Sequence, residues 1–294
     1  MTKELKTYIQ EKRPSLSEGS LKTYVSILKS LHKKIWGGEI DINDYDDTDK
    51  VLDHLKEMPS NKRKTILSAL VVITDKKPYR DLMMTDVSDY NKEINKQEKT
   101  DNQKESWIST EEVKVIYEML KKNADLLYKK NTHTANEIQQ IQNYVILALL
   151  GGVFIPPRRS LDYCEFKIKN INKETDNYLD KNKLVFNRYK TAKTYGTQEV
   201  VIPVQLRNIL TKYTKINPSE YLLVDTNGNK LNSVKLNQRL NSIFCGKKAA
   251  VNALRHSYLT GKYAESSKKQ KELEADLTEM GSSMNVSKNY IKID

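Results

Sequence analysis

The sequence is poor in the residues that build metal sites and disulfide frameworks. It contains only two cysteines, Cys164 and Cys245, which form neither a CxxC pair nor a disulfide pattern. It also contains only four histidines, and no two of them stand at the spacing of metal ligands. We therefore expect a reducing environment and no metal.

Long apolar runs are missing as well. The longest, residues 144–157 ("YVILALLGGVFIPP"), is interrupted by Gly151 and Gly152. It is also shorter than the ~20 residues that a membrane-spanning helix requires. The first residues, "MTKELKTYIQEK", lack the apolar segment and the cleavage site of a secretory signal. These absences predict an intracellular protein with no membrane partner.

Positive charge is what the chain has in excess. Lys and Arg number 50 against 38 Asp and Glu, which gives a formal net charge of +12 and a pI near 9.3. Such a protein attracts polyanions, either nucleic acid or an anionic membrane surface. No basic amphipathic helix with an aromatic and leucine face stands out, so nucleic acid is the favoured partner.

The first part of the chain has the pattern of a small helical domain. Apolar residues recur at helical spacing from Leu21 to Ile35, with Ser17 as the expected cap before them and the pair Gly37 and Gly38 after them. The segments "DKVLDHLKEM" and "NKRKTILSALVVITD" predict further helices.

The last of these helices begins with three basic residues, Lys62, Arg63 and Lys64. The helix dipole disfavours positive charge in a first turn, and a DNA phosphate would relieve that cost. These residues are therefore candidate DNA contacts, and the alternative is a solvated charged turn.

A polar segment then separates two domains. Residues 93–105, "EINKQEKTDNQKE", contain a single aliphatic residue and many charges, as a hydrated linker does. We expect an N-terminal helical domain over residues 1–92, a linker over 93–106 and a second domain over 107–294. The second domain opens with Ser109 and Glu112 at capping-box spacing.

The second domain mixes helices with a few strands. Three β-prone runs, "EFKIKN", "NKLVFNRYK" and "QEVVIPV", predict a small three-stranded antiparallel sheet, and helical patterns precede and follow it. The expected fold class is mainly α with a small antiparallel β-sheet.

Four residues of this domain could act on a phosphodiester: Arg159, Lys190, Arg255 and Tyr290, each at an element end or a turn. Two arginine forks can hold the non-bridging oxygens of one phosphate and stabilise a pentacoordinate transition state. A lysine on a hairpin can protonate a leaving oxygen. A tyrosine oxygen becomes a nucleophile where positive charge favours the phenolate.

This ordered set resembles the tyrosine recombinase and integrase family, and the resemblance spans both domains. Arg159 and Asp162 match its Arg-x-x-Glu/Asp motif better than a frame that starts at Arg158, so Asp162 is the expected partner of Arg159. Lys190 matches the hairpin lysine that precedes Thr in a "KT" turn, and Lys193 is the second choice. Arg158 and Lys193 are then expected to contact DNA.

The remaining motifs match with two departures. "NALRHS" supplies Arg255 and His256 but has Asn252 where the family has histidine, and "MGSSMNVSKNY" supplies Tyr290 but has Ser282 in the second histidine position. Asn252 and Ser282 can donate hydrogen bonds to phosphate but cannot take up a proton, which predicts slow cleavage. His256 points about 100° away from Arg255 on a helix, so we expect a structural hydrogen bond from it.

The resemblance implies an N-terminal core-binding (SAM-like) domain and a catalytic domain that close on double-stranded DNA. It implies attack by Tyr290 to give a 3′-phosphotyrosyl intermediate, without metal or other cofactor, in a homo-oligomer (a tetramer) on paired sites. The sequence looks most like recombinases of large DNA viruses, virophages and related mobile elements, which would act in the cytoplasm, nucleus or viral factory.

Two other functions fit the same residues. A type IB topoisomerase shares the Arg, Lys, Arg, Tyr chemistry but relaxes supercoils as a monomer. A non-catalytic DNA-binding relative would bind duplex DNA in a salt-sensitive manner and form no covalent adduct.

Overall fold

The computed structural model describes residues 2–292, with side chains from Glu4 onward. The chain forms two compact units, residues 1–98 and 99–294. The division falls within the segment expected to be a linker, but most of that segment is helical. Helix α5 (Lys77–Asn95) runs into it, and the short helix α6 (Asp101–Glu105) begins with a complete capping box between Thr100 and Gln103.

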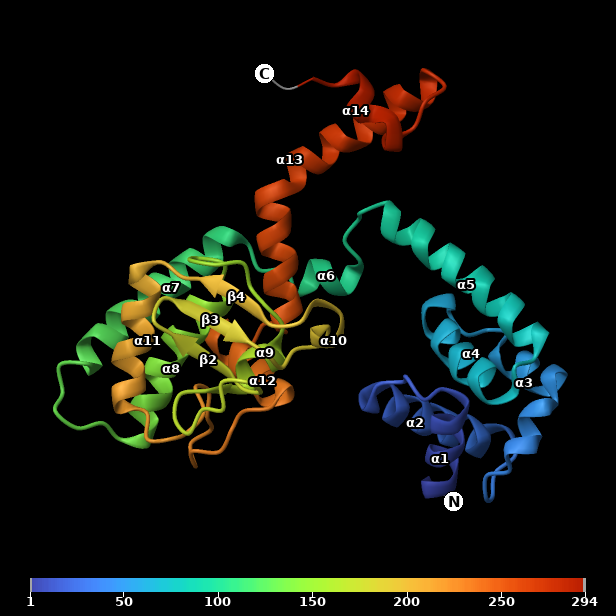
Figure 1. Ribbon diagram of the computed structural model, residues 1–294, viewed down its shortest axis with the longest axis horizontal. Coiled ribbons are helices and arrows are strands. Elements are labelled where there is room, and N and C mark those ends of the chain that lie inside the picture. The colour runs from blue at the N-terminus through green and yellow to red at the C-terminus, as the bar shows by residue number, and fades with distance from the viewer. Residues whose placement is uncertain (1, 293–294) are drawn as a thin grey trace. The chain divides into compact units, whose positions relative to one another are not determined.

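The first unit is entirely helical over its described residues (Figure 1). Its other elements are α1 (Thr2–Lys12), α2 (Glu18–Ile35), the 3₁₀ turn η1 (Ile42–Asp46), α3 (Thr48–Leu55) and α4 (Ser60–Thr74). Helix α2 confirms the sequence pattern, because the Ser17 hydroxyl accepts a hydrogen bond from the Ser20 N–H at 3.1 Å and the helix stops just before Gly37. Its apolar stripe is buried in a core shared with α1, α3 and α4.

The basic first turn of α4 differs from the expectation. Arg63 lies inside the unit, where its Nε and Nη2 donate to the two oxygens of Asp86 at 2.9 and 2.7 Å. Lys64 lies over the ring of Tyr90, and burial lowers its pKa. Lys62 alone of the three is exposed. The cost of positive charge in this turn is therefore offset by a carboxylate and a ring of α5, and two of the three expected phosphate contacts are occupied within the protein.

The second unit packs helices around a small sheet. Its helices are α7 (Thr110–Leu127), α8 (Ala135–Leu150), α9 (Ser160–Cys164), α10 (Ala192–Tyr195), α11 (Val204–Ile216), α12 (Ser233–Ile243), α13 (Val251–Glu279) and α14 (Ser287–Tyr290), with the 3₁₀ turn η2 (Met284–Val286). The apolar run that was too short for a membrane forms the end of α8, and its residues 144–150 are all buried against α7 and α11. The Ser109 hydroxyl caps α7 as expected, at 3.0 Å from the Glu112 nitrogen.

The sheet has four strands rather than three. Strands β1 (Phe166–Lys167), β3 (Lys183–Phe186) and β4 (Gln198–Val201) lie in the expected runs, and β2 (Asn177–Asp180) was not expected. The strand order is β1-β2-β3-β4, with β1 parallel to β2 and the other pairs antiparallel. The mainly helical class with a small sheet is confirmed, and the sheet is mixed because β2 inserts between β1 and the β3–β4 hairpin.

Helix α13 is one continuous helix of 29 residues. Only its first turns are anchored: Val251, Leu254 and Ser257 are buried, and the Ser257 hydroxyl donates to the Ile108 carbonyl. Beyond Gly261, Leu277 is its one fully buried residue. The helix therefore leaves the body of the second unit and carries α14 at its far end (Figure 1).

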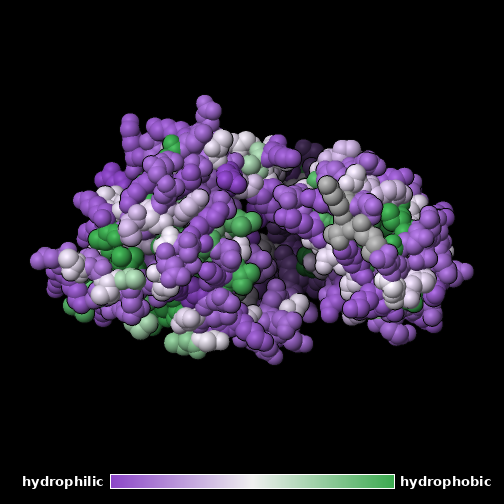
Figure 2. All heavy atoms as spheres, turned by 90° about the horizontal axis from the view of Figure 1, so that it is seen from below, coloured by the Kyte–Doolittle hydropathy of each residue, from purple (hydrophilic) through white to green (hydrophobic). Residues whose placement is uncertain are grey.

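None of the helices in the described residues has both the length and the apolar character needed to cross a membrane. The face shown in Figure 2 is mainly hydrophilic, with small and scattered apolar patches.

The Arg63–Asp86 pair predicts a stability effect in the first unit. Asp86 is 1% exposed, so Arg63→Met leaves a buried carboxylate without its partner. We expect a loss of about 3–5 kcal/mol in unfolding free energy. Urea denaturation in a Trp107→Phe background, where Trp36 fluorescence reports this unit, measures it.

Lys62→Met is the matched control, since Lys62 is exposed, and it should change stability by less than about 0.5 kcal/mol. The double variant Arg63→Met/Asp86→Leu should recover most of the loss, because no buried charge remains. Equal stability of Arg63→Met and Lys62→Met would contradict the ion-pair role.

Candidate active site

Arg159 begins α9 and is only partly buried. Its backbone is extended (φ −72°, ψ 154°), and its carbonyl accepts the Asp162 N–H at 3.1 Å. In the part of the chain that the structure describes, no carboxylate oxygen lies within 4.0 Å of its guanidinium, whereas Arg158 next to it is ion-paired. The Arg159 fork is thus available to an anion.

Arg158, expected to contact DNA, is held inside the protein. Its Nε donates to Asp162 Oδ2 at 2.9 Å, its Nη1 donates to Gln198 Oε1 at 2.9 Å, and its guanidinium carbon lies 4.1 Å from the centre of the Phe186 ring. The ion-pair partner of Asp162 is therefore Arg158 and not Arg159. Arg158 lies outside α9 and the backbone of Arg159 is extended, so this pairing is a contact across the start of the helix and does not follow from helical spacing.

Asp162 is 1% exposed and sits between these two cations. Burial raises its pKa, and the charges of Arg158 and Arg159 act in the opposite direction. The carboxyl is thus a buried acid whose ionised form depends on the arginines beside it.

Lys190 lies in the β3–β4 hairpin, as the sequence predicted. The Tyr189 hydroxyl donates to the Gly196 carbonyl at 2.6 Å and closes the loop that holds α10. Lys190 and Lys193 are both exposed, and neither has a carboxylate within 4.0 Å among the described residues. Both amines can reach an anion bound at this hairpin.

The first turns of α13 present Asn252 and Arg255 together. Arg255 Nη1 donates to Asn252 Oδ1 at 3.3 Å, so both side chains lie on one face, as their spacing predicted. The helix begins at Ala250 with no side-chain cap and no acidic residue in its first turn. Apart from the Val251 N–H, which Asn237 Oδ1 accepts, the N–H groups of its first turn and the positive end of its dipole add to the charge of Arg255.

The arginine segments meet through α12. Ser160, next to Arg159, donates from its hydroxyl to Ser233 Oγ at 3.1 Å. One turn further along α12, Asn237 Oδ1 accepts the N–H of Val251 at 3.2 Å. Because residues four apart lie on one helical face, α9 and the start of α13 are neighbours. Figure 1 shows both elements with α10 at the same end of the sheet.

Tyr290 and Ser282 are not part of this cluster. From Arg255 to Glu279 the helix is unbroken, which corresponds to about 36 Å at the rise of an α-helix. Ser282 follows the far end, where its N–H donates to the Leu277 carbonyl at 2.7 Å, and Tyr290 is 60% exposed on α14. The nucleophile candidate therefore lies remote from the arginines of its own chain.

His256 does not make the structural hydrogen bond that was expected. Its side chain is exposed and has no hydrogen-bond partner among the described residues. It neither supports Arg255 nor replaces the missing histidine.

Two features of the site were not found from the sequence. Lys248 is exposed and lies two residues before Ala250, the N-cap of α13. In the sequence, only its position in a basic pair ahead of a helix pointed to it. Gly152 packs against α13, because a Cβ there would come within 2.4 Å of Tyr258 Cδ2. Its place after an apolar helix suggested only a helix stop.

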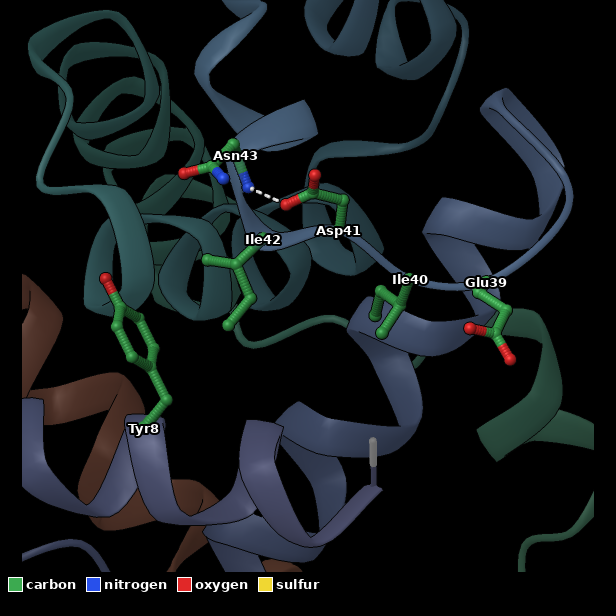
Figure 3. Close-up of a pocket in the computed structure, with 6 residues that line it drawn as sticks. All are labelled: Tyr8, Glu39, Ile40, Asp41, Ile42 and Asn43. Atoms are coloured by element: carbon green, nitrogen blue, oxygen red, sulfur yellow. Dashed lines mark hydrogen bonds between the residues drawn. The ribbon is translucent and has the colours of Figure 1, made fainter.

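A hollow in the first unit is not a second candidate. It has a volume of about 560 Å³ and is open to solvent (Figure 3). Its lining residues are Tyr8, Glu39, Ile40, Asp41, Ile42 and Asn43. The Asn43 N–H donates to Asp41 at 2.9 Å. Two carboxylates on its rim would repel a phosphate.

Comparison of sequences gives no match to a protein-family model or to a curated protein. Among solved structures, the chain is similar to a XerH site-specific recombinase bound to difH substrate in a pre-cleavage complex. That alignment has a TM-score of 0.40 and 17% identity and covers 99% of this chain and 91% of the other. A post-cleavage complex of XerH on palindromic difH gives 0.41 and 17%, covering 89% and 84%.

A lambda integrase (75–356) dimer bound to a COC′ core site is similar with a TM-score of 0.43 and 12% identity, covering 90% of this chain and 87% of the other. At this distance no residue role transfers from these structures, so the site rests on its own side chains.

The Gly152 contact predicts a specific packing effect. Gly152→Ala places a methyl group against Tyr258 at a residue with φ of +72°. We expect a loss of about 1–2 kcal/mol from the backbone and about 1–3 kcal/mol more from the forced contact. Urea unfolding followed through Trp107 measures the total.

Gly228→Ala is the matched control, because Gly228 has φ of +77° with nothing within 4 Å of the added methyl group. It should show the backbone part alone. In a Tyr258→Ala background the two alanine substitutions should cost about the same, and a persistent difference there would refute the contact.

Proposed function

We propose that the protein cleaves and rejoins duplex DNA as a site-specific recombinase of the tyrosine type. What supports this proposal is that hydrogen bonds through α12 and the sheet join the segments that carry Arg159, Lys190 and Arg255, and that these three cations have no carboxylate partner among the described residues. Two arginine forks and a positive helix end suit a phosphodiester. The net charge of +12 suits a polyanionic partner.

In the proposed reaction, Arg159 and Arg255 donate to the two non-bridging oxygens of the scissile phosphate. The Tyr290 oxygen attacks phosphorus, and the bond from phosphorus to the 5′ oxygen breaks. Lys190 gives its proton to that oxygen, and water takes the phenol proton because Asn252 cannot accept one. The products are a 3′-phosphotyrosyl link and a free 5′-hydroxyl, so the energy of the broken bond is conserved for rejoining.

The position of Tyr290 adds a condition to this mechanism. Helix α13 is unbroken from Arg255 to Glu279, so α14 reaches the phosphate held by another copy more readily than that of its own chain. The proposal therefore includes assembly of several copies on paired sites. The absence of imidazoles at Asn252 and Ser282 predicts slow chemistry, since such groups typically contribute ~10²–10⁴ in rate.

A binding-only function is the second candidate, and the separation of Tyr290 from the arginines favours it. That function predicts duplex binding that weakens steeply with salt and no covalent product. A type IB topoisomerase would instead relax supercoils as a monomer and give no recombinant product.

A covalent adduct is the decisive product. Mixing the protein with nicked suicide substrates drawn from a DNA library should give a slow-migrating species on denaturing gels, because the nick lets the 5′ product diffuse away. Tyr290→Phe should abolish it, and Tyr263→Phe, another exposed tyrosine beyond Gly261 on α13, should leave it unchanged. Duplex binding without any adduct would select the binding-only function.

Mixing two inactive variants tests which chain supplies the tyrosine. Tyr290→Phe keeps the arginines and Arg255→Ala keeps the nucleophile, so neither should form an adduct alone. If the tyrosine comes from another copy, the mixture should form an adduct on the Arg255→Ala chain, identified by a size tag. A silent mixture beside an active wild type would place the attack within one chain and require α13 to bend.

A further inference from the structure

Asn177 links the lysine hairpin to the arginine segment from inside the sheet. It lies in β2 and is completely buried. Its Oδ1 accepts the N–H groups of Asn187 and Arg188 at 2.9 and 2.7 Å, and its Nδ2 donates to the carbonyls of Arg188 and Asp162 at 2.8 and 2.9 Å. One side chain thus uses its whole hydrogen-bonding capacity to join the base of the hairpin to α9.

Arg158 makes a second link at the other side of the same elements. It joins Asp162 of α9 to Gln198 at the start of β4, and its guanidinium lies 5.2 Å from the centre of the Tyr189 ring. Tyr189 in turn closes the hairpin through its bond to Gly196. Arg158 therefore contacts both strand ends from which the hairpin leaves.

The tip of the hairpin is hydrogen-bonded mainly within itself, for example from the Gly196 N–H to the Ala192 carbonyl at 2.8 Å and from the Thr197 hydroxyl to Asn187 Oδ1 at 2.7 Å. Asn187 is bonded to the carbonyls of Lys173 and Asp176 at 2.9 and 2.8 Å, which again fixes only the base. Residues 193–196 are exposed, and Lys190 follows the fixed base by two residues. The backbone of Lys190 is therefore held by the bonds at the base of the hairpin, where the hairpin meets α9.

We infer that Arg158 and Asn177 form a two-point clasp that holds the Lys190 hairpin at a fixed position relative to the Arg159 segment. They are positioning residues and touch no reacting atom. The catalytic role of the clasp rests on the proposed function, whereas the mechanical link, which is the attachment of the hairpin to α9, does not depend on it.

Hydrogen exchange of the full-length protein tests the link itself. Arg158→Met and Asn177→Ala should speed amide exchange over residues 187–197 by at least about tenfold, because the base of the hairpin then opens without the rest of the unit. Arg158→Lys keeps the charge without the fork and should give a smaller change in the same residues, which guards against a variant that does not fold.

Two matched controls separate the clasp from general loosening. Asn217 is an equally buried asparagine that bonds the Tyr221 carbonyl and the Ser219 N–H, and Arg239 is a half-buried arginine bonded to Gln139. Neither touches the hairpin in these bonds. Asn217→Ala and Arg239→Met should leave exchange at 187–197 within about twofold of wild type. Equal acceleration by controls and clasp variants would overturn the inference.

Cleavage kinetics test the catalytic consequence. Clasp variants should lose on the order of 10²-fold in single-turnover cleavage of a suicide substrate, as a misplaced catalytic group does, while DNA affinity changes by less than about threefold. A substrate with sulfur at the 5′ bridging position needs no proton on its leaving group, so it should restore the variants to the wild-type rate.

The outcomes distinguish the two proposals. A defect that persists with the sulfur substrate would show that the clasp does not act through Lys190 and would overturn the positioning role. A wild type that forms no adduct on either substrate would overturn the proposed function and the positioning role with it, and hydrogen exchange alone would then decide whether the mechanical link exists.

Discussion

The Arg158 guanidinium, with only 18% of its side chain exposed, joins α9 to the sheet of the second unit. A guanidinium cannot lose its charge, so removing it from water demands a carboxylate, a second acceptor and polarisable surroundings. Asp162, Gln198 and the Phe186 ring supply these from α9, β4 and β3. Because these three residues surround the Arg158 guanidinium, the segment between α8 and α9 is held against the β3–β4 hairpin. The neighbouring Arg159 has no such partners among the described residues and is partly exposed.

Charge is distributed unevenly over the second unit. Many other basic residues of this unit are neutralised, such as Lys130 by Glu137 and Lys235 by Asp225. At the candidate site Arg159, Lys190 and Arg255 have no such partners among the described residues, and the start of α13 adds the positive end of a helix dipole. Part of the net charge of +12 therefore lies at the candidate site, where the negative charge of a phosphate would compensate it.

Sequence patterns predicted the structural features that depend only on residues close together in the chain. The caps at Ser17 and Ser109, the hairpin around Lys190 and the shared face of Asn252 and Arg255 all follow from spacing alone. The roles of Arg158 and Arg63 did not, because their partners Gln198 and Asp86 are 40 and 23 residues away. Strand β2 was missed because its four residues lie in a polar stretch, and only pairing with β1 and β3 makes them a strand.

Helix α13 runs unbroken through Gly261, because a glycine inside a helix costs only about 1 kcal/mol and no proline follows it. Because α13 extends far beyond its anchored base, a tilt at the base moves the far end of the helix over a larger distance. From Gly261 to Glu279 the helix is an arm of about 27 Å, so a tilt of ~10° at the anchored base sweeps its tip through about 5 Å. Gly261 packs against the Thr110 side chain, since a Cβ added at Gly261 would lie 2.8 Å from Thr110 Cγ2. A change of angle at that contact would therefore displace α14 at the far end of the helix much further than it displaces the base.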